Sequence, residues 1–173
     1  IELGHNKVQG LDYAYNLQSW LKGINSQQLD PAKDMSGDGN AGSLFPNVAR
    51  DVFGFSLRYF NGDYQPIDGQ ANAFGMTYQP SPLPNTESGN ELFNGNIRNA
   101  TLAISKLDNG ALKGYTYRYD QLNRLKKMRM HDLPAGGTNW DNNSIMPIYQ
   151  EDISYDGNGN IETYKRYGNT NPS

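Results

Sequence analysis

Residues 115–125 read YTYRYDQLNRL, and this stretch decides the fold class. Its first half alternates tyrosine with other residues, so a β-strand would place the three rings on one face. The rings are those of Tyr115, Tyr117 and Tyr119. Asp120 can open a turn, because its carboxylate can accept hydrogen bonds from N–H groups two residues further on. Asn123 can take the left-handed conformation that closes the turn, and Arg124 to Met130 would form the return strand. The stretch therefore predicts a β-hairpin.

Two further stretches follow the same template. Residues 11–21 read LDYAYNLQSWL, and residues 151–161 read EDISYDGNGNI. In all three, a large apolar or aromatic residue stands two positions before a tyrosine. Asp or Asn directly follows that tyrosine, and an aliphatic residue comes six positions after the tyrosine. Asn94–Ile97 is a partial fourth copy, with Glu91 in place of the tyrosine. A repeated hairpin is the signature of an array of similar units.

Composition supports an all-β chain. Gly (19) and Asn (21) make up 40 of 173 residues, and both types take positive φ readily and form helices poorly. Tyrosine (12) outnumbers phenylalanine (6), and tyrosine suits half-buried strands. We therefore expect many tight turns and no long helix.

The expected organisation is a single segment of a hairpin array, residues 1–173, with one loop-rich insertion. Its parts are a first hairpin at 7–26, an insertion with one hairpin at 27–91, a second repeat region at 92–130 and a third hairpin at 149–168. In the insertion, residues 52–60 alternate as a strand does, and Asn61-Gly62 reads as a turn into a partner strand at 63–65. Residues 79–84, QPSPLP, predict an extended connection.

Bulk properties exclude several classes of function. The chain has no cysteine, so it has no disulfide framework, thiolate zinc site or cysteine nucleophile. A net charge of -3 gives no electrostatic footprint for nucleic acid, and no apolar run is long enough to span a membrane. The first residues show neither an initiator Met nor a signal peptide, so we expect a segment of a longer polypeptide.

No motif assigns a catalytic, cofactor-binding or metal-binding residue. Residues 37–42, GDGNAG, match the letters of a dinucleotide fingerprint but follow no apolar strand and precede Pro46. His5 and His131 have no catalytic spacing to a serine or carboxylate. We expect no enzyme activity, although a hydrolase with a non-local site stays open.

Residues 34–40 resemble the first half of a calcium loop. The sequence leaves open whether Asp34 and Asp38 bind calcium, because Phe45 stands where such a loop carries a bidentate Glu.

The aromatic residues allow two interpretations. Four rings could form a sugar-stacking platform, and these are Trp20, Tyr59, Tyr78 and Trp140. Aromatic residues at period two in a β-protein more often pack between strands, which is the interpretation we favour.

The repeats resemble the Rhs/YD-repeat family, named for its Tyr-Asp dipeptide. Residues 117–125 and 155–161 are close to that repeat. Residues 8–25, 51–55 and 59–64 look like the version found in large secreted proteins of Bacteroidetes. The first copy departs from the pattern at Asn16 and Trp20, which puts its turn geometry in question.

The resemblance implies a strip of β-sheet that coils into a hollow shell around a C-terminal toxin or effector. We accordingly expect an exported, non-catalytic structural segment at the cell surface, without cofactor. Its partners would be neighbouring repeats of the same polypeptide, together with an enclosed toxin or effector domain or the secretion machinery. The alternative is a cell-surface adhesin or carbohydrate-binding module that uses the insertion at 27–91.

Overall fold

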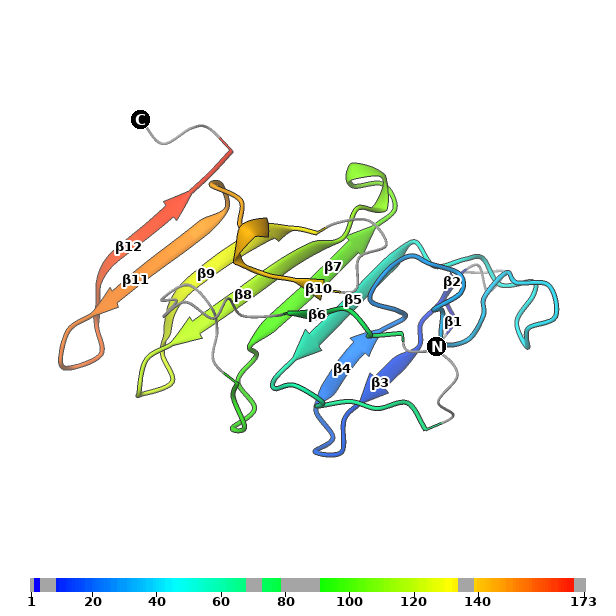
Figure 1. Ribbon diagram of the computed structural model, residues 1–173, viewed down its shortest axis with the longest axis horizontal. Coiled ribbons are helices and arrows are strands. Elements are labelled where there is room, and N and C mark those ends of the chain that lie inside the picture. The colour runs from blue at the N-terminus through cyan, green and yellow to red at the C-terminus, as the bar shows by residue number, and fades with distance from the viewer. Residues whose placement is uncertain (1, 4–8, 68–72, 79–90, 134–138, 170–173) are drawn as a thin grey trace.

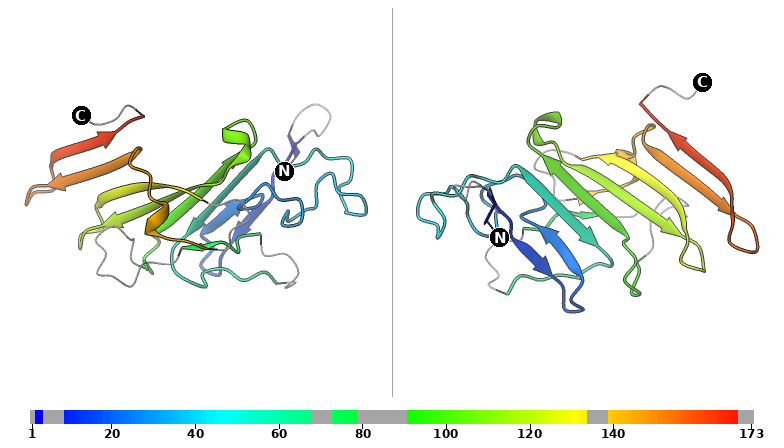
Figure 2. Two further views of the ribbon diagram at one scale, coloured as in Figure 1. Left: turned by 45° about the horizontal axis from the view of Figure 1, so that its top comes forward. Right: turned by 180° about the vertical axis from the view of Figure 1, so that it is seen from behind.

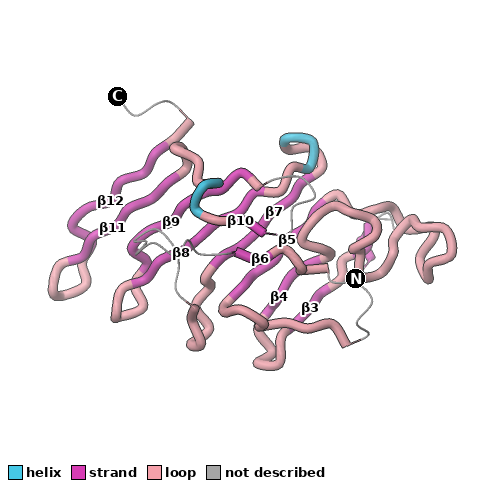
Figure 3. Tube along the Cα trace, in the orientation of Figure 1, coloured by secondary structure: helices cyan, strands magenta, loops and turns pink. Residues whose placement is uncertain are grey.

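The described chain is all-β, as the sequence predicts. The computed structural model describes residues 2–3, 9–67, 73–78, 91–133 and 139–169 (Figure 1). Within these residues the helical content is two short 3-10 turns, η1 (Asp108–Gly110) and η2 (Asn142–Ser144), so strands and loops dominate the trace (Figure 3). The predicted extended connection at residues 79–84 lies outside the described residues.

One antiparallel sheet of eight strands organises the molecule. Its order is β12-β11-β9-β8-β7-β5-β4-β3, which is also the order of these strands along the chain. The bounds are β3 (Tyr13–Tyr15), β4 (Leu21–Ile24), β5 (Phe53–Arg58), β7 (Asn99–Ile104), β8 (Lys113–Tyr119), β9 (Leu125–Asp132), β11 (Gln150–Tyr155) and β12 (Ile161–Tyr167). The sheet is therefore a meander, in which every strand pairs with its predecessor among the eight.

The three template stretches form antiparallel strand pairs. These pairs are β3–β4, β8–β9 and β11–β12, each joined by a five-residue turn at the lower edge of the view in Figure 1. Tyr115, Tyr117 and Tyr119 lie on β8, as predicted. The return strands also lie close to their predicted positions, since β9 starts at Leu125 and β12 spans Ile161–Tyr167.

The hairpin predicted inside the insertion does not form. β5 confirms the strand, but residues 63–65 are not a strand, and β5 pairs with β4 and β7 instead. The reason lies in Asp63, whose carboxylate accepts the Tyr59 N–H at 2.9 Å and contacts Lys22 Nζ at 2.8 Å. This side chain turns the backbone inward just where the return strand would start, and β7 takes the place beside β5.

One face of the sheet, here called the covered face, is packed under segments of the same chain. Two short parallel strands, β6 (Thr77–Tyr78) and β10 (Asn139–Trp140), lie in front of the sheet in Figure 1. The rings of Tyr78 on β6 and Trp140 on β10 form a core with other buried side chains, namely Met76, Ala103, Leu112 and Leu133. A second cluster joins Ala14 of β3 to Ala73 and Phe74. A further short pair, β1 (Glu2–Leu3) and β2 (Gln9–Gly10), lies near the N-terminal end of the described chain.

The opposite face carries the tyrosines and is called the tyrosine face. Its packed centre combines Leu57, Tyr59 and Ala100 with partly buried neighbours that include Tyr115 and Tyr117. Seen from behind, the strands of this face lie toward the viewer (Figure 2, right). The rings toward its ends are more open, since Tyr15 is 56% and Tyr164 is 52% exposed.

Among the described residues, each end of the sheet is an open edge. β3 and β12 are the outer strands, and each pairs with one neighbour among the described residues. Six of the seven residues of β12 are exposed, so this strand lacks cover on both faces as well as on its outer side. An exposed strand edge can accept a further strand by backbone hydrogen bonding.

Candidate functional site

The repeated turn is the most regular feature of the chain. Three residues open the three turns, and these are Asn16, Asp120 and Asp156. The side-chain Oδ1 of each accepts the backbone N–H groups two and four residues further on, at 2.8 to 3.1 Å. The backbone N–H of each opening residue donates to the carbonyl four residues on, at 3.0 Å. The first copy therefore adopts the same turn as the other two, with Asn16 replacing the aspartate.

A residue with positive φ stands fourth in every turn. These residues are Ser19 (φ 64), Asn123 (φ 61) and Gly159 (φ 90). Asn123 thus takes the left-handed conformation that the sequence predicts. Asn and Gly adopt this conformation at low cost, whereas a serine does so rarely.

A bulge at one equivalent position accompanies each turn. The register shifts at Ala14/Tyr15, Arg118/Tyr119 and Ser154/Tyr155, directly before the opening residue. A bulge bends its strand and increases the local right-handed twist. The three hairpins therefore share their turn and their source of twist, which the sequence template did not reveal.

The partial fourth copy forms the end of the long β5–β7 connection. Gly95 has φ 88, and the Asn96 N–H donates to Asn94 Oδ1 at 3.1 Å. The side-chain amides of Asn94 and Asn96 donate to Asn123 Oδ1 at 2.7 and 3.1 Å. These bonds tie the end of the β5–β7 connection to the turn of the β8–β9 hairpin.

A cavity of about 490 Å³ opens on the tyrosine face over β8, β9, β11 and β12. Its apolar lining consists of Leu107, Tyr115, Met128, Met130, Met146 and Tyr149. Two ion pairs border it, Lys113 with Asp108 and Arg166 with Glu151. The surface is thus an apolar hollow bordered by two ion pairs.

Burial governs the ionisation of the tyrosine face. Burial, followed by the neighbouring Tyr119 and Tyr115 hydroxyls, raises the pKa of Tyr117 to about 12. The ring therefore stays neutral at physiological pH and acts as a packing residue.

His131 lies buried in the covered face, with no exposed surface. Its Nδ1 lies 3.2 Å from the Asp141 carbonyl, which can only accept, so Nδ1 carries the proton and Nε2 accepts from Thr116 at 3.0 Å. Burial lowers the pKa of His131 to about 4, against the raising effect of Asp141. Through these hydrogen bonds, the neutral ring holds the 139–145 segment to the sheet. His5, the other histidine, lies outside the described residues.

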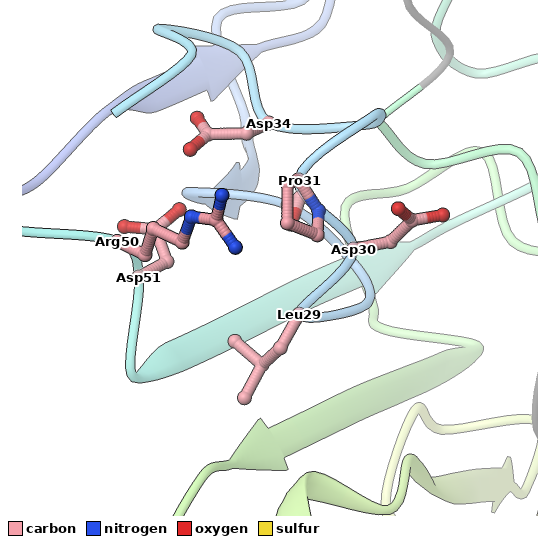
Figure 4. A pocket seen from close by; sticks show the side chains of 7 residues that line it. Leu29, Asp30, Pro31, Asp34, Arg50 and Asp51 are labelled. Carbon is pink, nitrogen blue, oxygen red and sulfur yellow. The ribbon is translucent and has the colours of Figure 1, made fainter. Parts of the chain in front are cut away.

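Asp34 and Asp38 belong to a group of carboxylates between the N-terminal strands and the loop before β5. Asp34, Arg50 and Asp51 line a pocket of about 260 Å³ beside Pro31 (Figure 4). Burial, then the charges of Asp34, Asp38 and Asp12, raise the pKa of Asp51 to about 7. The group therefore carries a partly protonated carboxyl at neutral pH.

The Asp34 side chain makes the contacts of a turn. Its carboxylate accepts the backbone N–H groups of Ser36, Gly37 and Asp38 at 3.0 to 3.2 Å, which is the pattern of a turn. Among the described residues, no three histidine, cysteine, aspartate or glutamate side chains are arranged to hold a metal ion. The dinucleotide-like residues 37–42 belong to the same turn-rich loop, and no helix follows them.

The sugar-stacking platform considered from the sequence does not exist as a surface. Tyr59, Tyr78 and Trp140 are at most 5% exposed. Tyr59 packs in the tyrosine face against Trp20, whereas Tyr78 and Trp140 pack together over the covered face. The interpretation as packing residues is the one that holds.

Sequence analysis missed a buried cation group, defined as Lys22, Arg58 and Arg98 around Asp63. Lys22 and Asp63 are each 1% exposed, and their Nζ and Oδ1 atoms lie 2.8 Å apart. Arg58 donates to the carbonyls of Phe74 and Met76. Burial and then the charge of Arg58 lower the pKa of Lys22 to about 8. Its members are scattered between positions 22 and 98, so no local motif signals them.

The chain matches no protein-family model, no curated protein and no solved structure. None of the described helices has the length and apolar character needed to cross a membrane.

Proposed function

We propose that the chain is a non-catalytic wall segment of an exported Rhs/YD-repeat shell, which would encapsulate or present a C-terminal toxin or effector at the cell surface. The observation that carries the proposal is the triple recurrence of one hairpin, with the same side-chain-capped turn and the same bulge. Recurrence of a supersecondary unit along one sheet is typical of architectural repeat proteins.

The shape of the sheet supports this role. The meander advances one hairpin at a time, and in the described part of the chain both of its outer strands have an open edge, so further hairpins can continue it. Equivalent bulges add twist in the same sense at the three repeated hairpins, which favours a sheet that coils. A wall of this kind needs paired edges and a packed face, and it needs no reacting group.

The test is electron microscopy of the longest native polypeptide that carries these residues, purified from culture medium and from cells. The proposal expects a hollow particle with residues 13–167 in its wall, recovered from the medium or the cell surface. A solid globular particle, or one confined to the cytoplasm, would overturn it.

A glycan array on the chain separates the wall segment from the adhesin alternative. The wall segment should bind no sugar. Reproducible binding that is lost in Tyr15→Ala would replace the proposal with the adhesin, because Tyr15 lies on the tyrosine face and is 56% exposed. Trp140→Ala is unsuitable here, since Trp140 belongs to the core.

A further inference from the structure

Four Asn-Gly pairs occur in the chain, and one of them has surroundings unlike the others. They begin at Asn61, Asn94, Asn109 and Asn158. In such a pair, the glycine nitrogen can attack the asparagine side-chain carbonyl, because glycine offers no side chain to obstruct the approach. The local fold decides whether the attack is helped or hindered.

Asn61 is held by a buried arginine and a glutamate. Arg98 Nη1 donates to Asn61 Oδ1 at 3.0 Å, and the Asn61 N–H donates to Glu91 Oε1 at 2.9 Å. The Arg98 side chain is 2% exposed, so its charge acts in a medium of low polarity. A charged donor on a carbonyl oxygen stabilises the negative charge that develops there during nucleophilic attack.

Gly62 leaves the attacking nitrogen accessible. The residue is exposed, has φ 73, and has no atom within 4 Å of the position that a Cβ would occupy. The Gly62 N–H makes no hydrogen bond to any of the described residues. The nitrogen therefore need not break a backbone bond before it reacts.

We propose that Asn61 is a self-modifying site, where the Gly62 nitrogen deamidates the side-chain amide polarised by Arg98. The Gly62 nitrogen bonds to Asn61 Cγ, and its proton passes through water to the departing amide nitrogen. The Cγ–Nδ2 bond breaks, ammonia leaves and a succinimide forms. Solvent water then opens the ring at Cγ to give aspartate, or at the main-chain carbonyl to give isoaspartate.

The surroundings also favour the product. A new carboxylate at position 61 would lie beside Arg98, at the rim of the buried cation group. That group brings three cations together with the carboxylates of Asp63 and Glu91. One further negative charge would balance the three positive charges.

The other three pairs lack this combination. Gly110 N and Gly159 N donate to backbone carbonyls at 3.0 and 3.1 Å, which restrains the attacking nitrogen after Asn109 and Asn158. Asn94 Oδ1 accepts a neutral backbone N–H, and the Asn94 amide is anchored on Asn123. These pairs are internal controls in the same molecule.

The experiment incubates the chain in mildly alkaline buffer, folded in one arm and in concentrated guanidinium in the other. Peptide mass spectrometry follows the conversion of amide to acid at all four sites. In the folded arm, we expect Asn61 to react at least about tenfold faster than Asn109 and Asn158. It should also react faster than it does in the denatured chain, because the Arg98 contact exists only in the fold. An Asn61 rate that folding leaves unchanged or lowers would overturn the proposal, as would equal rates at Asn61 and Asn158.

Arg98→Lys provides a variant test that keeps a positive charge but shortens the donor. In folded variant protein, the Asn61 rate should fall toward its denatured value while the Asn94 rate stays unchanged. An unchanged deamidation rate at Asn61 would show that Arg98 takes no part in the reaction and would overturn the proposal. If the variant does not fold, the wild-type comparison of folded and denatured chains still decides the matter.

Discussion

Lowering the pH from about 7 to about 4.5 should remove roughly 2 kcal/mol of folding stability through His131 alone. The ring is fully buried between Tyr78 and Trp140, and its Nδ1 and Nε2 atoms are both hydrogen-bonded in the neutral form. Protonation would place a positive charge among these buried aromatic rings.

The magnitude follows from the two pKa values. Burial lowers the pKa of His131 from 6.5 to about 4 in the folded chain. As the pH falls below 6.5, the unfolded chain takes up the proton first, so stability is lost between about pH 6.5 and pH 4. Each pKa unit is worth about 1.4 kcal/mol, which sets a ceiling of about 3 kcal/mol and gives roughly 2 kcal/mol by pH 4.5.

Urea unfolding followed by tryptophan fluorescence measures the effect, because Trp140 packs against the ring. The reference is the His131→Gln variant, whose side chain cannot titrate. Its change in folding stability with pH still contains the contribution of the carboxylates but no longer that of the histidine. Wild type should lose roughly 2 kcal/mol more than the variant between pH 7 and pH 4.5. Equal losses in both proteins would refute the assignment of a buried, neutral histidine.

Three further predictions concern packing, charge and turns. Asp63→Asn should lower the folding stability by roughly 3–5 kcal/mol, and by more than Lys22→Met does, because three buried cations share this carboxylate. Urea unfolding of the two variants measures this order. Gly114→Ala should lower the folding stability by about 1–3 kcal/mol, since its Cβ would lie 2.7 Å from Trp140 Cζ3. The control is Gly157→Ala, whose Cβ meets no atom within 4 Å, and equal melting temperatures of the two variants would contradict the prediction. Asn123→Ala should be about 1 kcal/mol less stable than Asn123→Gly in thermal unfolding, because both variants lose the same amide contacts and only alanine is strained at φ 61. The reverse order would contradict the left-handed conformation assigned to position 123.

The hairpins could be predicted because their information is local. Five residues between Asp120 and Arg124 contain the capping side chain, the positive-φ residue and both ends of the turn. The same local reasoning failed at Asn61-Gly62, where Asp63 contacts a lysine 41 residues away in the sequence. A turn signal of two residues cannot register such a contact.

The layer over the covered face could not be predicted. Met76, Tyr78 and Trp140 come from connections between strands of the large sheet, and nothing in their own sequence specifies which strands they cover. The same holds for the buried cation group, whose lysine and arginines read as ordinary surface residues. The proposed deamidation site combines both situations, because Asn61-Gly62 is visible in the sequence but its contact with Arg98 is not.

The unequal connections of the meander have a consequence for the order of folding. Three strand pairs are closed by five-residue turns, whereas β5 and β7 must be brought together across residues 59–98. Closing the longer loop costs about 2 kcal/mol more in chain entropy. We expect the three short hairpins to form early and the central β5–β7 pair to dock last, so that the sheet is joined from its two halves. Pulsed hydrogen exchange should then show protection at β8–β9 before protection at β5.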